Sequence, residues 1–240
     1  MTTLTPTHLV SLNLEAAEPA SLVIPRRTAL AVPNRRVDRW IKRGIDVVAS
    51  GLGLIALAPI MALIAVLIRL DSRGPILFRQ VRLGLNGGEF HCLKFRTMVP
   101  DAEARLKELE TLNESQGGVL FKIKSDPRVT PLGRFLRKSS LDELPQLFNV
   151  FWGEMSLVGP RPLQLRDCRN LIAIDPDGFE ERLRVLPGIT GPWQVGGRSD
   201  VSSEHMLDLD LDYVANHCLA TDLRILAQTV LVVLKGRGAC

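Results

Sequence analysis

The longest feature of the hydropathy pattern is an apolar run from Ile45 to Ile68, in which Asp46 is the only charged residue. Its length of about 24 residues would let a helix cross a bilayer core of roughly 30 Å. Basic residues flank the run on both sides, so the positive-inside rule assigns it no orientation. Pro59, near the midpoint, removes one backbone hydrogen bond and bends the helix. The pattern alone leaves a kinked span and a re-entrant helix, which returns to the side it entered, equally open.

Shorter periodic segments follow the apolar run. The alternation in PILFRQVRLG and FHCLKFRTM, with the turn-forming LNGGEF between them, predicts a β-hairpin over residues 75–98. DAEARLKELETLNES, which opens after Pro100, predicts an acidic, solvated helix. TDLRILAQTVLVVLKGRG predicts an amphipathic helix with Asp222 near its start and basic residues at its end, as the helix dipole favours. That helix suits either a core position or the membrane interface.

Composition narrows the function classes. The 240 residues are enough for one main domain, and the 46% hydrophobic content is concentrated in the apolar run, which indicates a membrane-embedded piece. The net charge of +4 suits anionic lipid or phosphorylated substrates. The arginines are not interleaved with aromatic residues and no zinc or helix-turn-helix pattern is present, so we expect no nucleic acid as partner. The four widely spaced cysteines predict free thiols in a reducing compartment.

The segment SSLDELPQLFNV contains two adjacent carboxylates, Asp142 and Glu143. One interpretation is a capping box, in which Ser140 and Glu143 cap a helix start. Pro145 would then be the fifth helical residue, whereas proline fits better at the first helical position. A helix beginning at Pro145 would place both carboxylates just before its N-terminus. Because adjacent carboxylates repel each other, this arrangement predicts a divalent metal or arginines beside them.

Arginines are plentiful around this pair. Arg128 and Arg137 precede it, and Arg161 follows it between two prolines in GEMSLVGPRPL. The prolines fix the backbone, so this guanidinium is preorganised for a phosphate contact, although the segment could equally be a rigid edge or linker. LPGITGPWQVGGRS adds the glycine-flanked Arg198 in a loop whose backbone can approach a ligand closely.

Taken together, the motifs resemble the bacterial sugar transferase family, the monotopic phosphoglycosyl transferases, in its exopolysaccharide-initiating branch. The resemblance rests on FRQVRLGLNGGEFHCLKFRTM, SDPRVTPLGRFLRKSSLDELPQLFNVFWGEMSLVGPRP, LPGITGPWQVGGR and the proline-containing apolar run, and it covers the chain from about Val37 onward. It implies an α+β fold: a small mixed helix/strand cytoplasmic catalytic domain with an N-terminal proline-broken re-entrant membrane helix and amphipathic interfacial helices. The expected divisions are a mobile tail without a signal-peptide pattern (1–36), the re-entrant helix broken at Pro59 (37–73) and the catalytic domain (74–240).

The resemblance also implies a reaction. Asp142 would attack the β-phosphate of a UDP-sugar, release UMP and form a covalent phosphoglycosyl-aspartate, and polyprenyl (undecaprenyl) phosphate would then accept the sugar phosphate. Glu143 would bind Mg²⁺. The substrate-binding arginines would be Arg161, Arg137, Arg128, Arg96 and Arg198. The enzyme would lie at the cytoplasmic face of the bacterial inner membrane as a monotopic protein in contact with membrane lipid, with a homodimer as one option.

Two matters stay open at this point. The competing hypothesis is a non-catalytic, membrane-anchored basic scaffold or lipid-binding protein, in which Asp142 and Glu143 are a helix start only. The motifs do not distinguish galactose, glucose and N-acetylated sugars. Ala58 also stands where some family members have a serine before the proline, so no hydroxyl is present there to bond the carbonyls that Pro59 frees.

Overall fold

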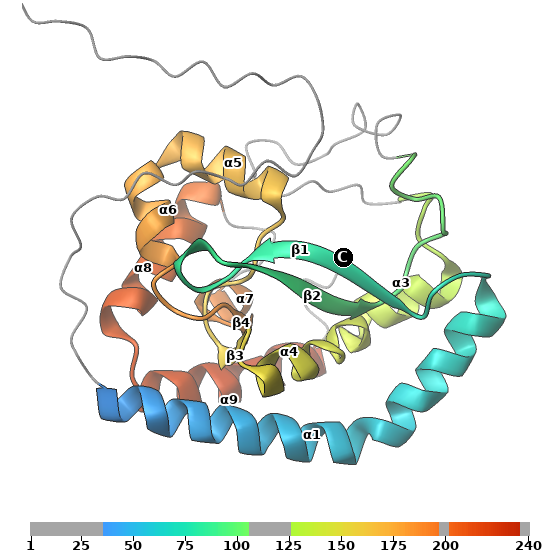
Figure 1. Ribbon diagram of the computed structural model, residues 1–240, viewed down its shortest axis with the longest axis horizontal. Coiled ribbons are helices and arrows are strands. Elements are labelled where there is room, and N and C mark those ends of the chain that lie inside the picture. The colour runs from blue at the N-terminus through green and yellow to red at the C-terminus, as the bar shows by residue number, and fades with distance from the viewer. Residues whose placement is uncertain (1–35, 106–125, 197–201, 236–240) are drawn as a thin grey trace, which may run out of the picture.

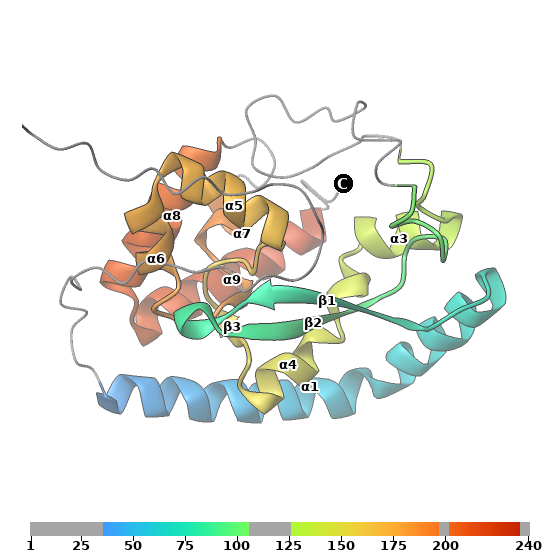
Figure 2. The same cartoon turned by 45° about the horizontal axis from the view of Figure 1, so that its top comes forward.

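The computed structural model describes residues 36–105, 126–196 and 202–235. A long helix, α1 (Arg36–Asp71), runs along one side of the molecule, and the other elements pack against it from one direction (Figures 1 and 2). The predicted N-terminal tail up to residue 35 and Arg198 lie outside the described residues. Most of the predicted acidic helix also lies outside them, and its first residues, 101–105, form turns.

Helix α1 is continuous through Pro59 and bends in its second half (Figures 1 and 2). This corrects the predicted break to a bend, because the neighbouring turns absorb the single hydrogen bond and the crowding that a proline costs. The segment Asp38–Asp71 is long and apolar enough to cross a membrane, and little of it is buried. Whether the helix re-enters the membrane or spans it stays a prediction.

The predicted β-hairpin is confirmed. Strands β1 (Leu77–Leu83) and β2 (Glu89–Phe95) pair antiparallel, with Leu77 opposite Phe95 at the open end. Phe95 is buried in a cluster with Ile64 and Ile68 of the second half of α1. The hairpin is therefore packed directly on the bent limb of the long helix.

The remaining elements form a mixed helix and strand body, as the α+β prediction requires. They are α3 (Pro131–Lys138), a 3₁₀ turn (Leu141–Glu143), α4 (Gln146–Trp152), β3 (Ser156–Val158), α5 (Leu165–Ile174), α6 (Pro176–Arg182), β4 (Gly188–Thr190), α7 (Pro192–Gly196), α8 (Ser203–Asn216) and α9 (Leu219–Lys235). Strand β3 pairs in parallel with β4. The largest apolar cluster joins α5, α6, α7 and α8 through side chains that include Leu171, Phe179 and Met206.

The predicted C-terminal amphipathic helix is confirmed as α9, which buries Ile225 and exposes Leu223, Val230 and Leu231. Its exposed apolar side chains, like those of α1, would suit a membrane interface. The membrane position itself stays a prediction.

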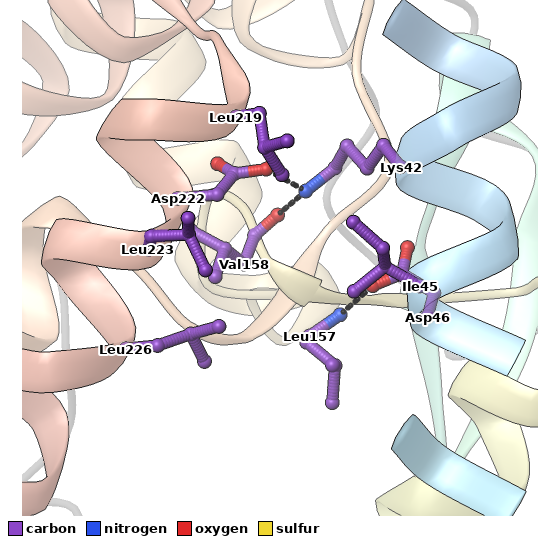
Figure 3. Close-up of a pocket in the computed structure, with 9 residues that line it drawn as sticks. All are labelled: Lys42, Ile45, Asp46, Leu157, Val158, Leu219, Asp222, Leu223 and Leu226. Carbon is purple, nitrogen blue, oxygen red and sulfur yellow. Dashed lines mark hydrogen bonds and ion pairs between the residues drawn. The ribbon is translucent and has the colours of Figure 1, made fainter. Parts of the chain in front are cut away.

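Polar contacts tie the first half of α1 to this body. Lys42 donates to Asp222 of α9 at 2.5 Å and to the carbonyl of Val158 at 3.0 Å (Figure 3). Asp46, the charge within the apolar run, is buried and accepts a hydrogen bond from the amide of Leu157 at 3.0 Å. A buried charge must be compensated, and here the backbone of β3 supplies the donor. The long helix and the strand that leads toward Arg161 are thereby held together.

Candidate active site

The two adjacent carboxylates lie in the 3₁₀ turn between α3 and α4. Helix α4 begins at Gln146 with Pro145 in the capping position, so the predicted helix start is confirmed to within one residue. Ser140 has a left-handed backbone, with φ of 57°, and its side chain makes no capping hydrogen bond. The capping-box interpretation is therefore wrong, and Asp142 and Glu143 lie ahead of the helix.

Apolar residues on either side of the pair fix the orientation of the turn. Leu141 and Leu144 pack against the cluster that contains Ile64 and Ile68 of α1. Because both leucines pack on this cluster, the carboxylates lie on the side of the turn where Lys94 of the hairpin and Arg161 of the Pro-Arg-Pro segment bind Glu143. The bent limb of α1 is thus part of the support of the candidate site.

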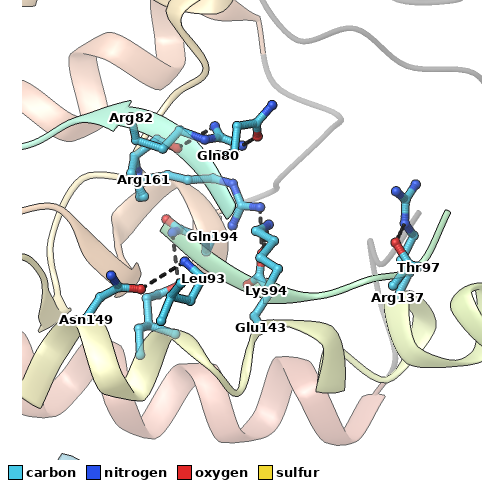
Figure 4. Close-up of polar contacts among 12 residues, drawn as sticks. Gln80, Arg82, Leu93, Lys94, Thr97, Arg137, Glu143, Asn149, Arg161 and Gln194 are labelled. Atoms are coloured by element: carbon cyan, nitrogen blue, oxygen red, sulfur yellow. Dashed lines mark hydrogen bonds and ion pairs between the residues drawn. The ribbon is translucent and has the colours of Figure 1, made fainter. Parts of the chain in front are cut away.

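Glu143 is held by two cations. Its Oε1 accepts hydrogen bonds from Lys94 of β2 and from Arg161, each at 2.8 Å (Figure 4). Burial alone would raise the pKa of Glu143, but the charges of Arg161 and Lys94, with their hydrogen bonds, hold that pKa well below its usual range. Glu143 is therefore ionised at neutral pH.

Asp142 is in a different state. Its side chain is buried, with 9% of the residue exposed. Among the residues that the structure describes, its carboxylate takes part in no hydrogen bond or ion pair. Burial raises the pKa of Asp142, and the adjacent charge of Glu143 adds to the rise while Lys94 and Arg137 oppose it. The pair thus contains one fixed anion and one carboxylate whose oxygens are unengaged, an arrangement suited to a nucleophile.

Two residues that sequence reasoning missed position this site. Lys94 lies in the predicted hairpin, but nothing local links it to a carboxylate 49 positions away. Asn149 is fully buried in α4 and donates to the carbonyl of His91 at 2.8 Å. Its side-chain oxygen accepts from the amide of Leu93 at 3.0 Å (Figure 4). Asn149 locks α4 to the edge of β2. The sequence does contain a signal for Asn149, because a single asparagine within the apolar segment QLFNVFW indicates a buried side chain that needs hydrogen-bond partners.

Arg161 bonds Glu143, in agreement with the prediction that arginines lie beside the adjacent carboxylates. The Pro-Arg-Pro segment follows β3, and the guanidinium carbon lies 5.8 Å from the centre of the Trp193 ring, within reach of a cation–π interaction. Among the described residues its guanidinium bonds only Glu143, through one nitrogen, so the other donors of the planar group are available to a substrate.

The other predicted arginines have separate surroundings. Arg137 donates to the Thr97 hydroxyl at 2.9 Å and contributes to the electrostatic environment of Asp142. In Figure 4 it lies apart from the Lys94 and Arg161 side chains. Its place as a second phosphate ligand stays a prediction.

Arg128 and Arg96 are engaged in local contacts. Arg128 pairs with Asp126 at 2.6 Å. Arg96 donates to the carbonyls of Ser72 and Arg73 at 2.7 and 3.1 Å, which ties the end of α1 to the end of β2. Within the described part of the chain no contact joins either arginine to the carboxylate pair, and their predicted substrate contacts are untested.

The donor set at the site fits a magnesium ion that is shared with a substrate. Among the described residues there is no group of three or more potential metal ligands. Mg²⁺ is commonly held by one or two carboxylates together with substrate phosphates and water. Within the described residues the second oxygen of Glu143 takes no hydrogen bond, so one carboxylate oxygen beside the unengaged Asp142 is available to such an ion.

An apolar helix long enough for a membrane, packed beneath a carboxylate pair with cations around it, is typical of a membrane-associated enzyme that acts on a charged substrate. The chain belongs to the bacterial sugar transferase family, whose sequence model matches residues 37–236.

Several relatives are similar to the chain over most of its length. It is 42% identical over 208 residues to the undecaprenyl-phosphate galactose phosphotransferase of Salmonella typhimurium and 39% identical over 235 residues to the undecaprenyl-phosphate glucose phosphotransferase of Komagataeibacter xylinus. These alignments cover 85% and 94% of the chain, but only 43% and 41% of the two relatives. The exopolysaccharide production protein ExoY of Sinorhizobium fredii is 40% identical over 219 residues, which are 90% of the chain and 94% of ExoY. The chain thus spans less than half of some relatives and nearly all of another.

Proposed function

We propose that the protein transfers a sugar 1-phosphate from a UDP-sugar to polyprenyl phosphate, releases UMP and thereby starts the assembly of an exopolysaccharide or another glycoconjugate. The names of the Salmonella and Komagataeibacter relatives support a polyprenyl phosphate acceptor. The observation that carries the proposal is the asymmetry of the carboxylates: two cations bind Glu143 at 2.8 Å, whereas Asp142 is buried and unengaged among the described residues.

The proposed reaction has two displacements at one phosphorus atom. An oxygen of Asp142 forms a bond to the β-phosphorus of the UDP-sugar, and the bond from that phosphorus to the bridging oxygen breaks as UMP leaves with the electron pair. A phosphate oxygen of the polyprenyl acceptor then attacks the same phosphorus and releases the aspartate. In each displacement negative charge moves onto the leaving oxygen, and Arg161 and Lys94 are placed to offset it.

Glu143 would hold Mg²⁺ together with the phosphates of the substrate. When bound, the ion would neutralise diphosphate charge and assist departure of the leaving phosphate. In this arrangement Arg161 and Lys94 keep Glu143 ionised and fixed in place, which a metal ligand requires.

An apolar groove next to the site suits the polyprenyl chain of the acceptor. It lies between the second half of α1, the start of the hairpin and α4, and is lined by Met61, Ala62, Ala65, Pro75, Ile76, Leu77, Phe78, Arg79, Phe95 and Phe148. Phe78 pairs across the hairpin with Lys94, the residue that binds Glu143. Arg79 gives the groove a cation for the acceptor phosphate, and the membrane helix that forms one wall would let the lipid enter laterally.

The membrane setting follows from the exposed apolar side chains. Trp40 is 78% and Ile55 75% exposed on α1, and Trp152 of α4 and Leu223 of α9 are 61% and 55% exposed. Exposure of large apolar side chains on three helices is costly in water and favourable in lipid. We propose that α1 enters and leaves the bilayer on the cytoplasmic side of the inner membrane, since both of its flanks are basic.

The direct test is incubation of the detergent-solubilised protein with Mg²⁺, polyprenyl phosphate and a panel of UDP-sugars. The proposal predicts UMP from the sugars that the site accepts, and none from Asp142→Asn. UMP release from no UDP-sugar would favour the membrane-anchored scaffold instead. The same panel would distinguish galactose, glucose and N-acetylated sugars.

A further inference from the structure

The backbone of the Pro-Arg-Pro segment is held at every carbonyl. Each of its three carbonyl oxygens accepts a hydrogen bond from a different and distant element, namely β4, α6 and β1. The donors are the amide of Gly188 to Pro160 at 2.9 Å, Nη2 of Arg182 to Arg161, and Nη1 of Arg82 to Pro162 at 2.9 Å. Two of the three donors are the side chains of buried arginines. Burying a charged guanidinium costs free energy that a backbone amide or a water molecule in the same place would not cost.

Arg182 is balanced by one carboxylate, Asp210 of α8. The two residues are 4% and 0% exposed, and Nε of Arg182 donates to Oδ2 of Asp210 at 2.7 Å. Oδ1 of Asp210 is buried and has no hydrogen-bond partner among the described residues. A fork-to-fork pair would have satisfied both carboxylate oxygens. The guanidinium is instead turned so that its Nη2 reaches the carbonyl of Arg161.

This orientation matters because of the prolines. Pro162 restricts the backbone of Arg161 to extended conformations, and Pro160 has its own φ fixed. The segment therefore moves as a stiff unit, and a hydrogen bond to its central carbonyl also fixes the direction in which the Arg161 side chain leaves. That side chain reaches Glu143 at 2.8 Å.

We propose that Arg182, with Asp210 as its buried counter-ion, is a positioning residue for Arg161. It sets the direction of the guanidinium toward Glu143 and the substrate phosphates without touching either. The assignment rests on the proposed function, in which Arg161 stabilises phosphoryl transfer. A pair present only for stability would be replaceable by apolar side chains of similar volume, because such replacements are often neutral for folding.

The test is a double-mutant cycle on the full-length protein in detergent, measuring single-turnover UMP release without acceptor. Arg182→Met combined with Asp210→Leu removes both charges together and so avoids an unpaired buried ion. We expect a melting temperature near that of the wild type and a rate lower by on the order of 10-fold. In a protein that already carries Arg161→Lys, the same pair of changes should lower the rate of UMP release little further, because Arg182 acts through Arg161 and that residue is already impaired.

Leu171→Ala is the matched control, because Leu171 is fully buried in the apolar cluster that joins α5, α6, α7 and α8, whereas the carbonyls of the Pro-Arg-Pro segment are bonded by Gly188, Arg182 and Arg82. Its effect on the rate should multiply with that of Arg161→Lys. Arg182→Lys keeps a charge for Asp210, so it provides a second variant if the double replacement does not fold, and it should show the same non-additive loss.

Failure of the positioning role and failure of the proposed function give different results. A folded Arg182 variant with the wild-type rate, or a loss that multiplies in full with Arg161→Lys, would overturn the positioning role while leaving the proposed function intact. A wild-type protein that releases no UMP from any UDP-sugar would instead overturn the proposed function, and it would be recognised before any variant is compared.

Discussion

Replacing Arg161 by lysine measures how much the planar guanidinium contributes. The arginine donates to Glu143 at 2.8 Å and lies 5.8 Å from the centre of the Trp193 ring, and 27% of its side chain is exposed. Loss of one charge-assisted hydrogen bond costs about 1.5–3 kcal/mol, and loss of a cation–π contact about 0.5–1 kcal/mol. Lysine keeps the positive charge and so recovers part of this sum. A net loss of about 1–3 kcal/mol in transition-state stabilisation corresponds to a rate about 5- to 150-fold lower.

The assay is single-turnover UMP release at saturating Mg²⁺, with thermal melting to confirm the fold. Arg184→Lys is the matched control, because Arg184 lies just beyond α6 and forms an ion pair with Glu181 at 2.8 Å. Its rate should stay near that of the wild type. A wild-type rate for Arg161→Lys, or an equal loss for Arg184→Lys, would show that the guanidinium of Arg161 makes no specific contribution.

Further predictions concern stability, topology and thiol reactivity. Asn149→Ala should lower the free energy of unfolding by about 2–4 kcal/mol in chemical denaturation, since it unpairs buried backbone groups of β2, while Asn216→Ala, which removes an exposed contact, should change it by less than about 0.5 kcal/mol. Cysteine-accessibility labelling at the two ends of α1 should report one compartment, and Pro59→Ala should shift some molecules to opposite compartments; no shift would show that packing sets the bend. Burial raises the pKa of the Cys168 thiol to about 11, so maleimide at pH 8 should label the half-buried Cys218 before Cys168, which should react only after unfolding; rapid labelling of Cys168 in the folded protein would contradict this.

Local sequence patterns predicted the features that depend on residues close together in the sequence, namely the hairpin, the start of α4 and the bend at Pro59. The hairpin follows from alternation and a glycine-containing turn within about 25 residues, and the start of α4 follows from the conformational limits of Pro145. The bend at Pro59 was predicted from the same chemistry. Its extent was overestimated, because the energy of one lost hydrogen bond is small beside that of the surrounding helical turns and the packing of Ile64 and Ile68 on the hairpin.

Contacts between distant elements could not be read in this way. Lys94 reaches Glu143, and Asn149 reaches the edge of β2, only because helix α4 packs across the hairpin in one register. Arg96, which the family resemblance implies as a substrate-binding residue, donates to carbonyls at the end of α1, and its substrate contact stays a prediction. Charge identifies which side chains could bind phosphate, and the fold decides which of them face the site.

The central claim is that Asp142 is a covalent nucleophile, and mass spectrometry of the enzyme mixed with UDP-sugar and Mg²⁺, without polyprenyl phosphate, tests it most directly. If Asp142 is the nucleophile, the mixture should release up to about one equivalent of UMP, and the protein should become heavier by one sugar phosphate on the proteolytic peptide that contains Asp142. Asp142→Asn should form no adduct while still binding UDP-sugar, because Arg161, Lys94 and Glu143 remain in place. No adduct on the wild-type protein under any trapping condition, or full turnover by Asp142→Asn, would show that Asp142 is not the nucleophile.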